Sequence, residues 1–92
     1  MDFKVSSINN QFILSGVIQA QNFKKVKKGI TSLLKKYHTI ILDINNVSKM
    51  DAYSVNSIIN IFEKTSNTNK DISIKGFGAK DIYDELIQKN IV

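Results

Sequence analysis

The sequence contains no cysteine, no proline and no tryptophan, and all of its 13 basic residues are lysine. The absence of cysteine excludes a disulfide framework, a thiolate zinc site and a cysteine nucleophile. The absence of arginine removes the planar, bidentate side chain that reads guanine or clamps a phosphate group. These absences exclude several classes of enzyme and of sequence-specific nucleic-acid binder.

Long hydrophobic runs are also missing. No segment reaches the roughly 20 apolar residues that a membrane-spanning helix needs, so we expect no direct membrane insertion. The first residues do not combine a basic segment with an apolar one, as a signal peptide does. Together with the missing cysteines, this pattern favours a reducing, cytoplasmic location.

The residues that are present predict one folded domain over residues 1–92. The 92-residue chain is 42% hydrophobic, which is typical of a globular protein and too high for a disordered one. It contains 15 isoleucines, so the core should be mainly aliphatic. No linker, repeat or low-complexity tract divides it.

The net charge of +5 attracts anions in general. The joint excess of lysine, asparagine and isoleucine is, however, typical of an AT-rich coding sequence, and no aromatic residues interleave with the lysines to stack bases. We therefore interpret the basic cluster as a solvated face and expect no specific nucleic-acid partner. Its members are Lys24, Lys25, Lys27, Lys28, Lys35 and Lys36.

Two strands are predicted at the start of the chain, over residues 3–7 and 12–18, paired as a hairpin around Asn9-Asn10. Gly16 marks a bulge or a close approach in the second strand. A helix is predicted over Gln19–Tyr37. Within it, Gly29 either permits close packing against the sheet or has no structural role. The apolar stripe of this helix consists of Phe23, Val26, Ile30, Leu33, Leu34 and Tyr37.

A third strand is predicted over residues 40–44, and Asn45 and Asn46 should end it with turn chemistry. Asp51 then occupies the position of a helix N-cap, where a carboxylate accepts backbone N–H groups of the first turn. The helix that follows has one apolar face, formed by Val55, Ile58, Ile59 and Phe62.

The last predicted elements are a strand around Ile72 and Ile74, a loop over residues 76–78 and a helix over residues 81–90. The order is β-β-α-β-α-β-α. We therefore predict an α/β fold with a small mixed four-stranded sheet and three helices, which lie mainly on one face of the sheet.

Three features suggest catalysis or ligand binding only weakly. The segment Gly76–Lys80 lacks the third glycine of a dinucleotide fingerprint and the Lys-Ser/Thr ending of a P-loop. His38 is the only histidine and has no evident partner for metal binding or catalysis. Asp81, Asp84 and Glu85 suit the positive end of a helix dipole. We predict no enzyme, no metal and no cofactor.

Residues 50–57 are the remaining candidate site. They read either as an ordinary capped helix start or as a docking surface, and both readings stay open at this point. Tyr53 is a large amphipathic residue of the kind enriched in protein interfaces. The hydroxyl groups of Tyr53, Ser54 and Ser57 are potential phosphate acceptors at a helix N-terminus.

The order of the motifs resembles that of the STAS domain family. The resemblance is carried by Ile41–Ile44, Val47 and Met50-Asp51, with Phe12–Gly16 upstream and Ile72–Gly76 downstream. The family includes bacterial anti-sigma-factor antagonists and the small cytosolic subunit of Mla-type lipid-asymmetry ABC transporters. The resemblance covers nearly the whole chain and implies a small mixed sheet with helices on one side.

The resemblance implies a non-catalytic module that binds proteins. Its partner would be an anti-sigma or kinase-like regulator, or alternatively the ATPase of an ABC-type phospholipid transporter. The compact length, ending at Val92, is similar to that of the transporter subunits. The partner-binding residues implied by the family are Met50, Asp51, Ala52, Tyr53, Ser54 and Ser57.

The chain departs from the family at the phosphorylation motif. When the motif is aligned on Asp51, Ala52 and Tyr53 replace the usual serine or threonine and the usual phosphoserine. Ser54 comes one residue later, which rotates its hydroxyl about 100° around the helix. It is therefore the remaining candidate phosphoacceptor, and the sequence favours constitutive docking over a standard phosphoswitch.

Overall fold

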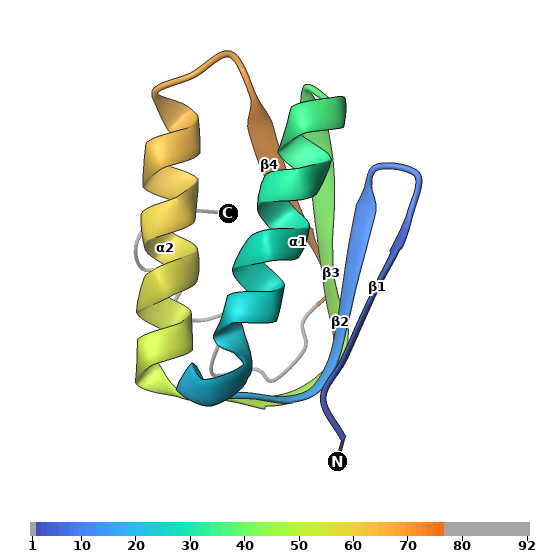
Figure 1. Cartoon of the computed structure of the whole chain (residues 1–92), viewed down its shortest axis with the longest axis vertical. Coiled ribbons are helices and arrows are strands. Elements are labelled where there is room, and N and C mark those ends of the chain that lie inside the picture. The colour runs from blue at the N-terminus through green and yellow to red at the C-terminus, as the bar shows by residue number, and fades with distance from the viewer. Residues whose placement is uncertain (1, 77–92) are drawn as a thin grey trace.

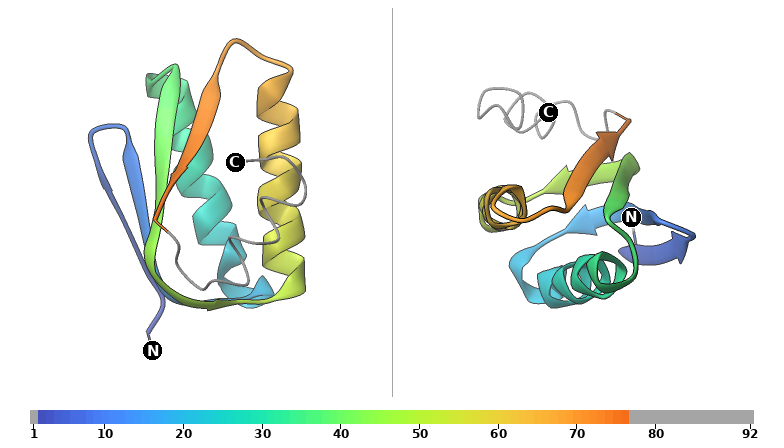
Figure 2. Two further views of the ribbon diagram at one scale, coloured as in Figure 1. Left: turned by 180° about the vertical axis from the view of Figure 1, so that it is seen from behind. Right: turned by 90° about the horizontal axis from the view of Figure 1, so that it is seen from above.

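The computed structural model describes residues 2–76, which form a sheet with two α-helices against one face (Figures 1 and 2). The mixed four-stranded sheet and the order of these elements agree with the prediction. The predicted loop after Gly76 and the helix over residues 81–90 lie outside the described residues. The elements are β1 (Lys4–Ile8), β2 (Gln11–Ile18), the 3₁₀-helix η1 (Ala20–Asn22), α1 (Phe23–Lys36), β3 (Thr39–Met50), α2 (Ala52–Ser66) and β4 (Asp71–Lys75).

The strands are arranged in the order β1-β2-β3-β4. The first pair is the predicted antiparallel hairpin, and Asn9 adopts a left-handed conformation with φ 53° in its turn. Asparagine tolerates this region better than most residues. The pairs β2–β3 and β3–β4 are parallel. Each is joined through a helix, and right-handed crossovers that advance in the same direction place both helices on one face.

The core lies between that face and the helices. Alternate residues of β2 and β3 point inward, as the period of two along a strand requires. Most of the predicted stripes of both helices are buried against them. The buried hydrophobic residues are Phe12, Leu14, Ile18, Phe23, Val26, Ile30, Leu33, Ile40, Leu42, Ile44, Val47, Ile58, Ile59 and Phe62.

The first helix begins later than predicted. Instead of one helix from Gln19, the chain forms η1 and then α1. Asn22 explains the break, because its side chain accepts from the Gln19 backbone N–H at 2.8 Å and donates to the Val17 carbonyl at 3.2 Å. These bonds hold a tight turn between strand and helix. At the other end Tyr37 is extended and 36% exposed, so it does not belong to the buried stripe.

Gly29 was predicted either to permit close packing against the sheet or to have no structural role. The structure shows the close packing. A β-carbon at this position would overlap the tip of the buried Phe12 ring. The ring therefore packs directly on the backbone of α1. Gly16 combines both roles that were considered for it. It has φ +82°, it lies at a register shift in β2–β3, and a β-carbon there would overlap the Asp2 carbonyl group.

The prediction that Asn45 and Asn46 end the third strand was wrong. The strand continues to Met50, with a bulge where Ile13 pairs with Asp43 but Ser15 pairs with Asn46. The Asp43 side chain accepts from the Asn45 backbone N–H at 3.0 Å. The side chain that makes this local turn is thus Asp43 rather than the predicted asparagines, and the strand pairs with β2 through a bulge here instead of ending.

Candidate functional site

Asp51 joins the starts of two helices. One carboxylate oxygen accepts from the Ser54 backbone N–H at 2.9 Å, which confirms the predicted N-cap of α2. The other accepts from the Ala20 backbone N–H at 2.9 Å, at the start of η1. The Asp51 backbone N–H in turn donates to the Ile18 carbonyl at 3.1 Å. The link from Asp51 to Ala20 was not predicted, because it depends on the pairing of Ile18 with Met50 at the ends of β2 and β3.

The surroundings of the Asp51 carboxylate stabilise its charged form. The nearby Ser54 hydroxyl has the largest effect on the pKa of Asp51; together with the backbone N–H groups of Ser54 and Ala20, it lowers this pKa below its ordinary value despite the opposing effect of burial. The Ser54 hydroxyl oxygen has no partner in hydrogen-bond geometry among the described groups, whereas the backbone N–H groups of Ser54 and Ala20 both donate to the carboxylate. Asp51 is therefore a charged structural anchor.

The six predicted partner-binding residues differ in their accessibility. Ala52 and Tyr53 are exposed, and Tyr53 retains 59% of its accessible surface. Met50, Asp51 and Ser57 are half-buried, and Met50 packs against the core. Ser54 is fully buried. The accessible part of this set thus centres on Tyr53, which projects from the first turn of α2.

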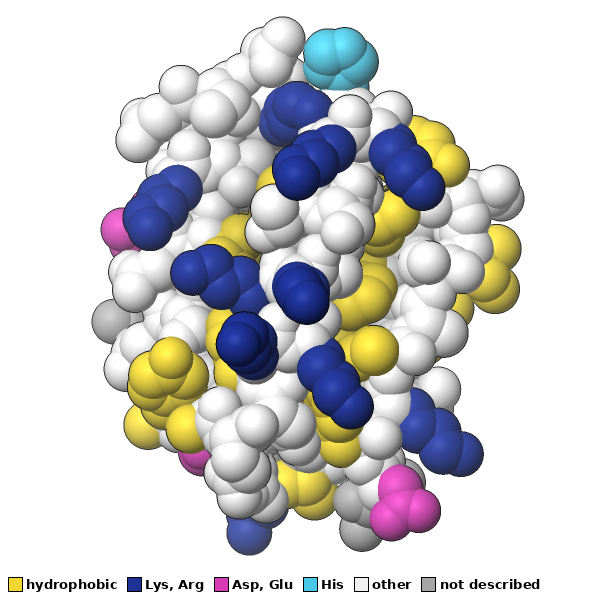
Figure 3. Space-filling model, viewed as in Figure 1, with side chains coloured by type: hydrophobic (Ala, Val, Ile, Leu, Met, Phe, Trp, Pro, Cys, Tyr) yellow, Lys and Arg dark blue, Asp and Glu magenta, His cyan; other side chains and the backbone are white. Residues whose placement is uncertain are grey.

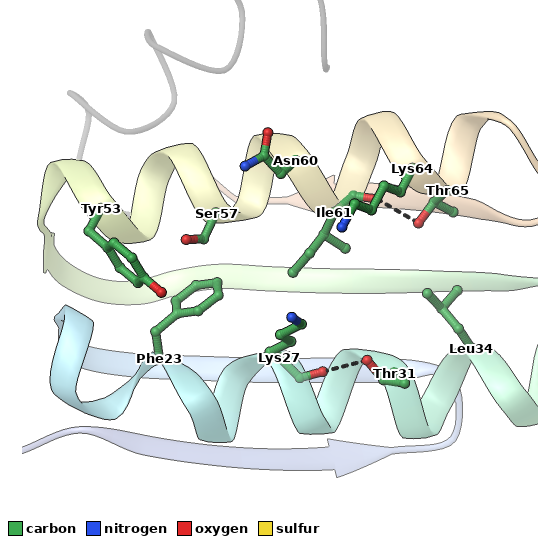
Figure 4. Close-up of a pocket in the computed structure, with 10 residues that line it drawn as sticks. All are labelled: Phe23, Lys27, Thr31, Leu34, Tyr53, Ser57, Asn60, Ile61, Lys64 and Thr65. Atoms are coloured by element: carbon green, nitrogen blue, oxygen red, sulfur yellow. Dashed lines mark hydrogen bonds between the residues drawn. The ribbon is translucent and has the colours of Figure 1, made fainter.

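Tyr53 is exposed and also held by a neighbour. Its ring meets that of Phe23 edge to face, with centroids 6.2 Å apart and an interplanar angle of 88° (Figure 4). Such aromatic pairs contribute about 0.5–1.5 kcal/mol beyond the area that they bury. Phe23 belongs to α1, so this contact fixes the ring across the two helices. The sequence contains no short-range signal for it.

The hydroxyl of Ser54 lies in the interior, where its oxygen has no hydrogen-bond partner among the described residues. A kinase would reach this oxygen only if the first turn of α2 opened. Phosphorylation of Ser54 therefore stays a prediction, and one that requires local unfolding. Of the hydroxyl-bearing residues in the predicted set, Tyr53 is the most exposed.

A groove runs between α1 and α2 from Tyr53 at one end toward Leu34 at the other (Figure 4), with a volume of about 460 Å³. We call this the interhelix groove. Tyr53 and Ser57 were predicted site residues, whereas the other eight were not assigned to a site. The residues that line it are Phe23, Lys27, Thr31, Leu34, Tyr53, Ser57, Asn60, Ile61, Lys64 and Thr65.

The lysines of α1 are exposed, and most of them lie on the outer side of the helix, whereas Lys27 lines the interhelix groove. Figure 3 shows lysine side chains gathered over α1, with hydrophobic surface on either side of it. The 14-residue helix contains no acidic residue. This arrangement agrees with the predicted solvated face, and it also surrounds the interhelix groove with positive potential.

The described residues supply no group of three or more His, Cys, Asp or Glu side chains that could hold a metal ion. The His38 side chain is exposed, and the backbone carbonyl of this residue accepts from the Asp71 N–H at 2.8 Å. None of the helices between residues 2 and 76 is long and apolar enough to cross a membrane.

Comparisons with known proteins show the fold and nothing more specific. No protein-family model and no curated protein matches the chain. A solved structure described as "Crystal Structure Analysis of Mglu" superposes with a TM-score of 0.62 at 18% sequence identity. The match covers 78% of this chain but only 19% of the other. It thus supports a small α/β fold that occurs within a much longer protein.

Proposed function

We propose that this chain is a non-catalytic, STAS-like protein-interaction module of the anti-sigma-factor antagonist type. It docks a kinase-like regulatory partner through the loop and helix start at Met50–Ser57. The order of elements, the mixed sheet and the position of this helix start after a parallel strand support the STAS-like assignment. The proposal assigns no reaction to the chain.

The observation that carries the proposal is an exposed tyrosine on a rigidly held helix start. Asp51 fixes the first turn of α2 with hydrogen bonds to Ser54 and Ala20. Phe23 fixes the orientation of the Tyr53 ring. Because these contacts restrict the helix start and the ring before binding, they lower the entropic cost for a partner that uses the Tyr53 surface.

The test starts with affinity purification of the tagged protein from its host, followed by mass spectrometry. We expect recovery of a kinase of the histidine-kinase fold or of another sigma-regulatory protein. The Tyr53→Ala variant should then bind that purified partner about 10- to 30-fold more weakly, as expected for an interface anchor. Isothermal titration calorimetry measures the change.

Tyr37→Ala is the matched control, because Tyr37 is another partly exposed tyrosine on a different part of the surface. It should leave the affinity unchanged. Equal affinities of the wild-type protein and a folded Tyr53→Ala variant would show that the proposed docking surface is wrong.

A second candidate function is favoured by the positions of the hydroxyl groups near the start of α2. The residue at the family's phosphoserine position is Tyr53, and Ser54 is buried, so a serine kinase finds no accessible acceptor in register. Constitutive docking suits an accessory subunit of an ABC-type phospholipid transporter. Recovery of an ATPase together with its permease in the same purification would support this candidate over the first.

A further inference from the structure

The interhelix groove has the dimensions of a ligand site. It extends along α1 from Phe23 to Leu34, which corresponds to about 16 Å at 1.5 Å per residue. Its volume of about 460 Å³ falls in the range of small-molecule sites. The Phe23–Tyr53 ring pair narrows one end (Figure 4). The space is thus long and narrow, which fits a linear ligand.

Part of the groove is apolar along its length. Phe23 contributes an aromatic ring, while Leu34 and Ile61 contribute aliphatic side chains from opposite helices. Two threonines make the lining less polar than their side chains suggest, because each hydroxyl donates a hydrogen bond to a backbone carbonyl of its own helix. Thr31 donates to the Lys27 carbonyl at 2.8 Å, and Thr65 donates to the Ile61 carbonyl at 2.7 Å. Their hydroxyl protons are therefore already in use.

Two cations flank this apolar surface from opposite sides. Lys27 projects from α1 and Lys64 from α2, and Figure 4 shows both amines directed toward the space between the helices. None of the described residues that line the groove is acidic. A ligand with a negative charge between these amines would gain two charge-assisted contacts. Ser57 and Asn60 offer further hydrogen-bonding groups at the α2 wall.

We propose that the interhelix groove binds a single-chain anionic amphiphile. The apolar chain lies along Phe23, Leu34 and Ile61, and a carboxylate or phosphate head lies between Lys27 and Lys64. Binding is non-covalent and does not require the proposed protein partner, although Tyr53 and Ser57 belong to both surfaces. The positive charge of the lining selects a negatively charged head group, and the long apolar surface selects an extended apolar chain on the ligand.

The test measures binding of dodecyl phosphate and dodecanoate, each below its micelle-forming concentration, to the full chain by calorimetry and by ¹⁵N-resolved NMR. We expect saturable binding of at least one of them, with the largest shifts at groove residues. The Lys27→Gln/Lys64→Gln double variant should bind about tenfold more weakly, or weaker still, because two contacts to a charged head are lost.

Lys24→Gln/Lys28→Gln is the matched control. It removes the same charge from exposed positions of α1 that do not line the groove, and it should change the affinity by about twofold or less. An equal loss in both double variants would overturn the proposal in favour of general charge attraction. Circular dichroism verifies that both variants are folded.

Two further probes distinguish the contribution of the charged head group to binding from that of the apolar chain. Inorganic phosphate binding as tightly as dodecyl phosphate would overturn the role of the apolar surface. Uncharged dodecanol binding as tightly as the anions would overturn the role of the lysines. The stronger of dodecyl phosphate and dodecanoate identifies a phosphate-bearing lipid or a free fatty acid as the source of the head group. Lack of binding by both anions would reject the proposal.

The outcome is separable from that of the proposed function. Lys27 and Lys64 lie outside Met50–Ser57, so their double variant tests the ligand without altering the docking residues. Tyr53→Ala tests the docking of the protein partner. A chain that binds the partner but neither amphiphile would reject this inference alone.

Discussion

Asp51 shows how much one side chain can organise at a crossover. Its two carboxylate oxygens accept hydrogen bonds from residues 31 and 3 positions away in the sequence, Ala20 and Ser54. Both donors are backbone N–H groups at helix starts, which otherwise have no partner within their helix. The same carboxylate therefore caps α2 and ties it to the start of η1.

Replacement of Asp51 by alanine is expected to lower the free energy of unfolding by about 1–2 kcal/mol, because the N-cap and the link to Ala20 are lost together. Urea denaturation at neutral pH measures the loss. Glu63→Ala removes an exposed acidic residue from the same helix and should stay within about 0.5 kcal/mol of the wild type. An equal loss in both variants would contradict the capping role.

The contribution of Asp51 to stability should depend on pH. The pKa of Asp51 is lower in the folded state than in the unfolded chain, where a value of about 3.9 is expected. As the pH falls, the unfolded state therefore takes up this proton first. The stabilisation is complete above the unfolded pKa and is lost as the pH falls through the folded pKa.

We accordingly expect the stability difference between the wild type and Asp51→Asn to be constant above about pH 5 and to shrink below about pH 4. Urea denaturation at a series of pH values gives the difference at each point. A difference that stayed constant down to about pH 2 would show that the carboxylate is not stabilised in the folded state.

At the scale of elements, α1 is positioned by a contact between backbone and ring. Phe12 of β2 is buried and packs where Gly29 leaves out a side chain. The helix thereby approaches the sheet more closely than a larger residue would allow. This proximity gives the otherwise unfavourable glycine within α1 a structural purpose.

Gly29→Ala tests this packing, because two effects of opposite sign compete. Helix propensity alone would stabilise the protein by about 1 kcal/mol. The new methyl group would overlap the Phe12 ring in a close-packed core, which typically costs about 1–3 kcal/mol. We expect net destabilisation in thermal and urea denaturation.

A double-mutant cycle provides the control for Gly29. Phe12→Leu removes the tip of the ring, so Gly29→Ala should be less harmful, or favourable, in that background. If Gly29→Ala also stabilises the otherwise wild-type protein, which retains Phe12, the close contact has no energetic importance.

At the scale of the whole molecule, the two helices lie side by side on one sheet face and leave the interhelix groove between them. Strand order and crossover handedness determine this arrangement. The exposed lysines of α1 then add a positive field beside the groove. Both the docking surface and the groove therefore depend on the packing of α1 beside α2.

The positive field predicts weak, non-specific binding to DNA. With up to six lysines of α1 near phosphate groups, affinity for duplex DNA should fall about a thousandfold between 50 and 200 mM salt, with no preference for sequence. Fluorescence anisotropy with two unrelated duplexes measures both properties. Binding that persists at 200 mM salt and distinguishes the duplexes would instead indicate a specific nucleic-acid function.

Much of the fold follows from short-range patterns in the sequence. The period of two in β2 and the apolar stripe of α2 report directly which face each element buries. Asn9 adopts the left-handed conformation of its turn and Asp51 caps the first turn of its own helix, so these two local roles can be predicted from neighbouring residues alone. For the same reason, the first helix and the start of the second could be located within a few residues.

The tertiary structure decided the features that depend on partners distant in sequence. Pairing with β2 carried β3 through Asn45 to Met50 and brought Asp51 to Ala20. The placement of α1 beside α2 brought Phe23 against Tyr53 and created the interhelix groove. Local sequence encodes which face of an element is apolar, whereas contacts between elements arise only when the sheet register and the crossovers set their relative positions.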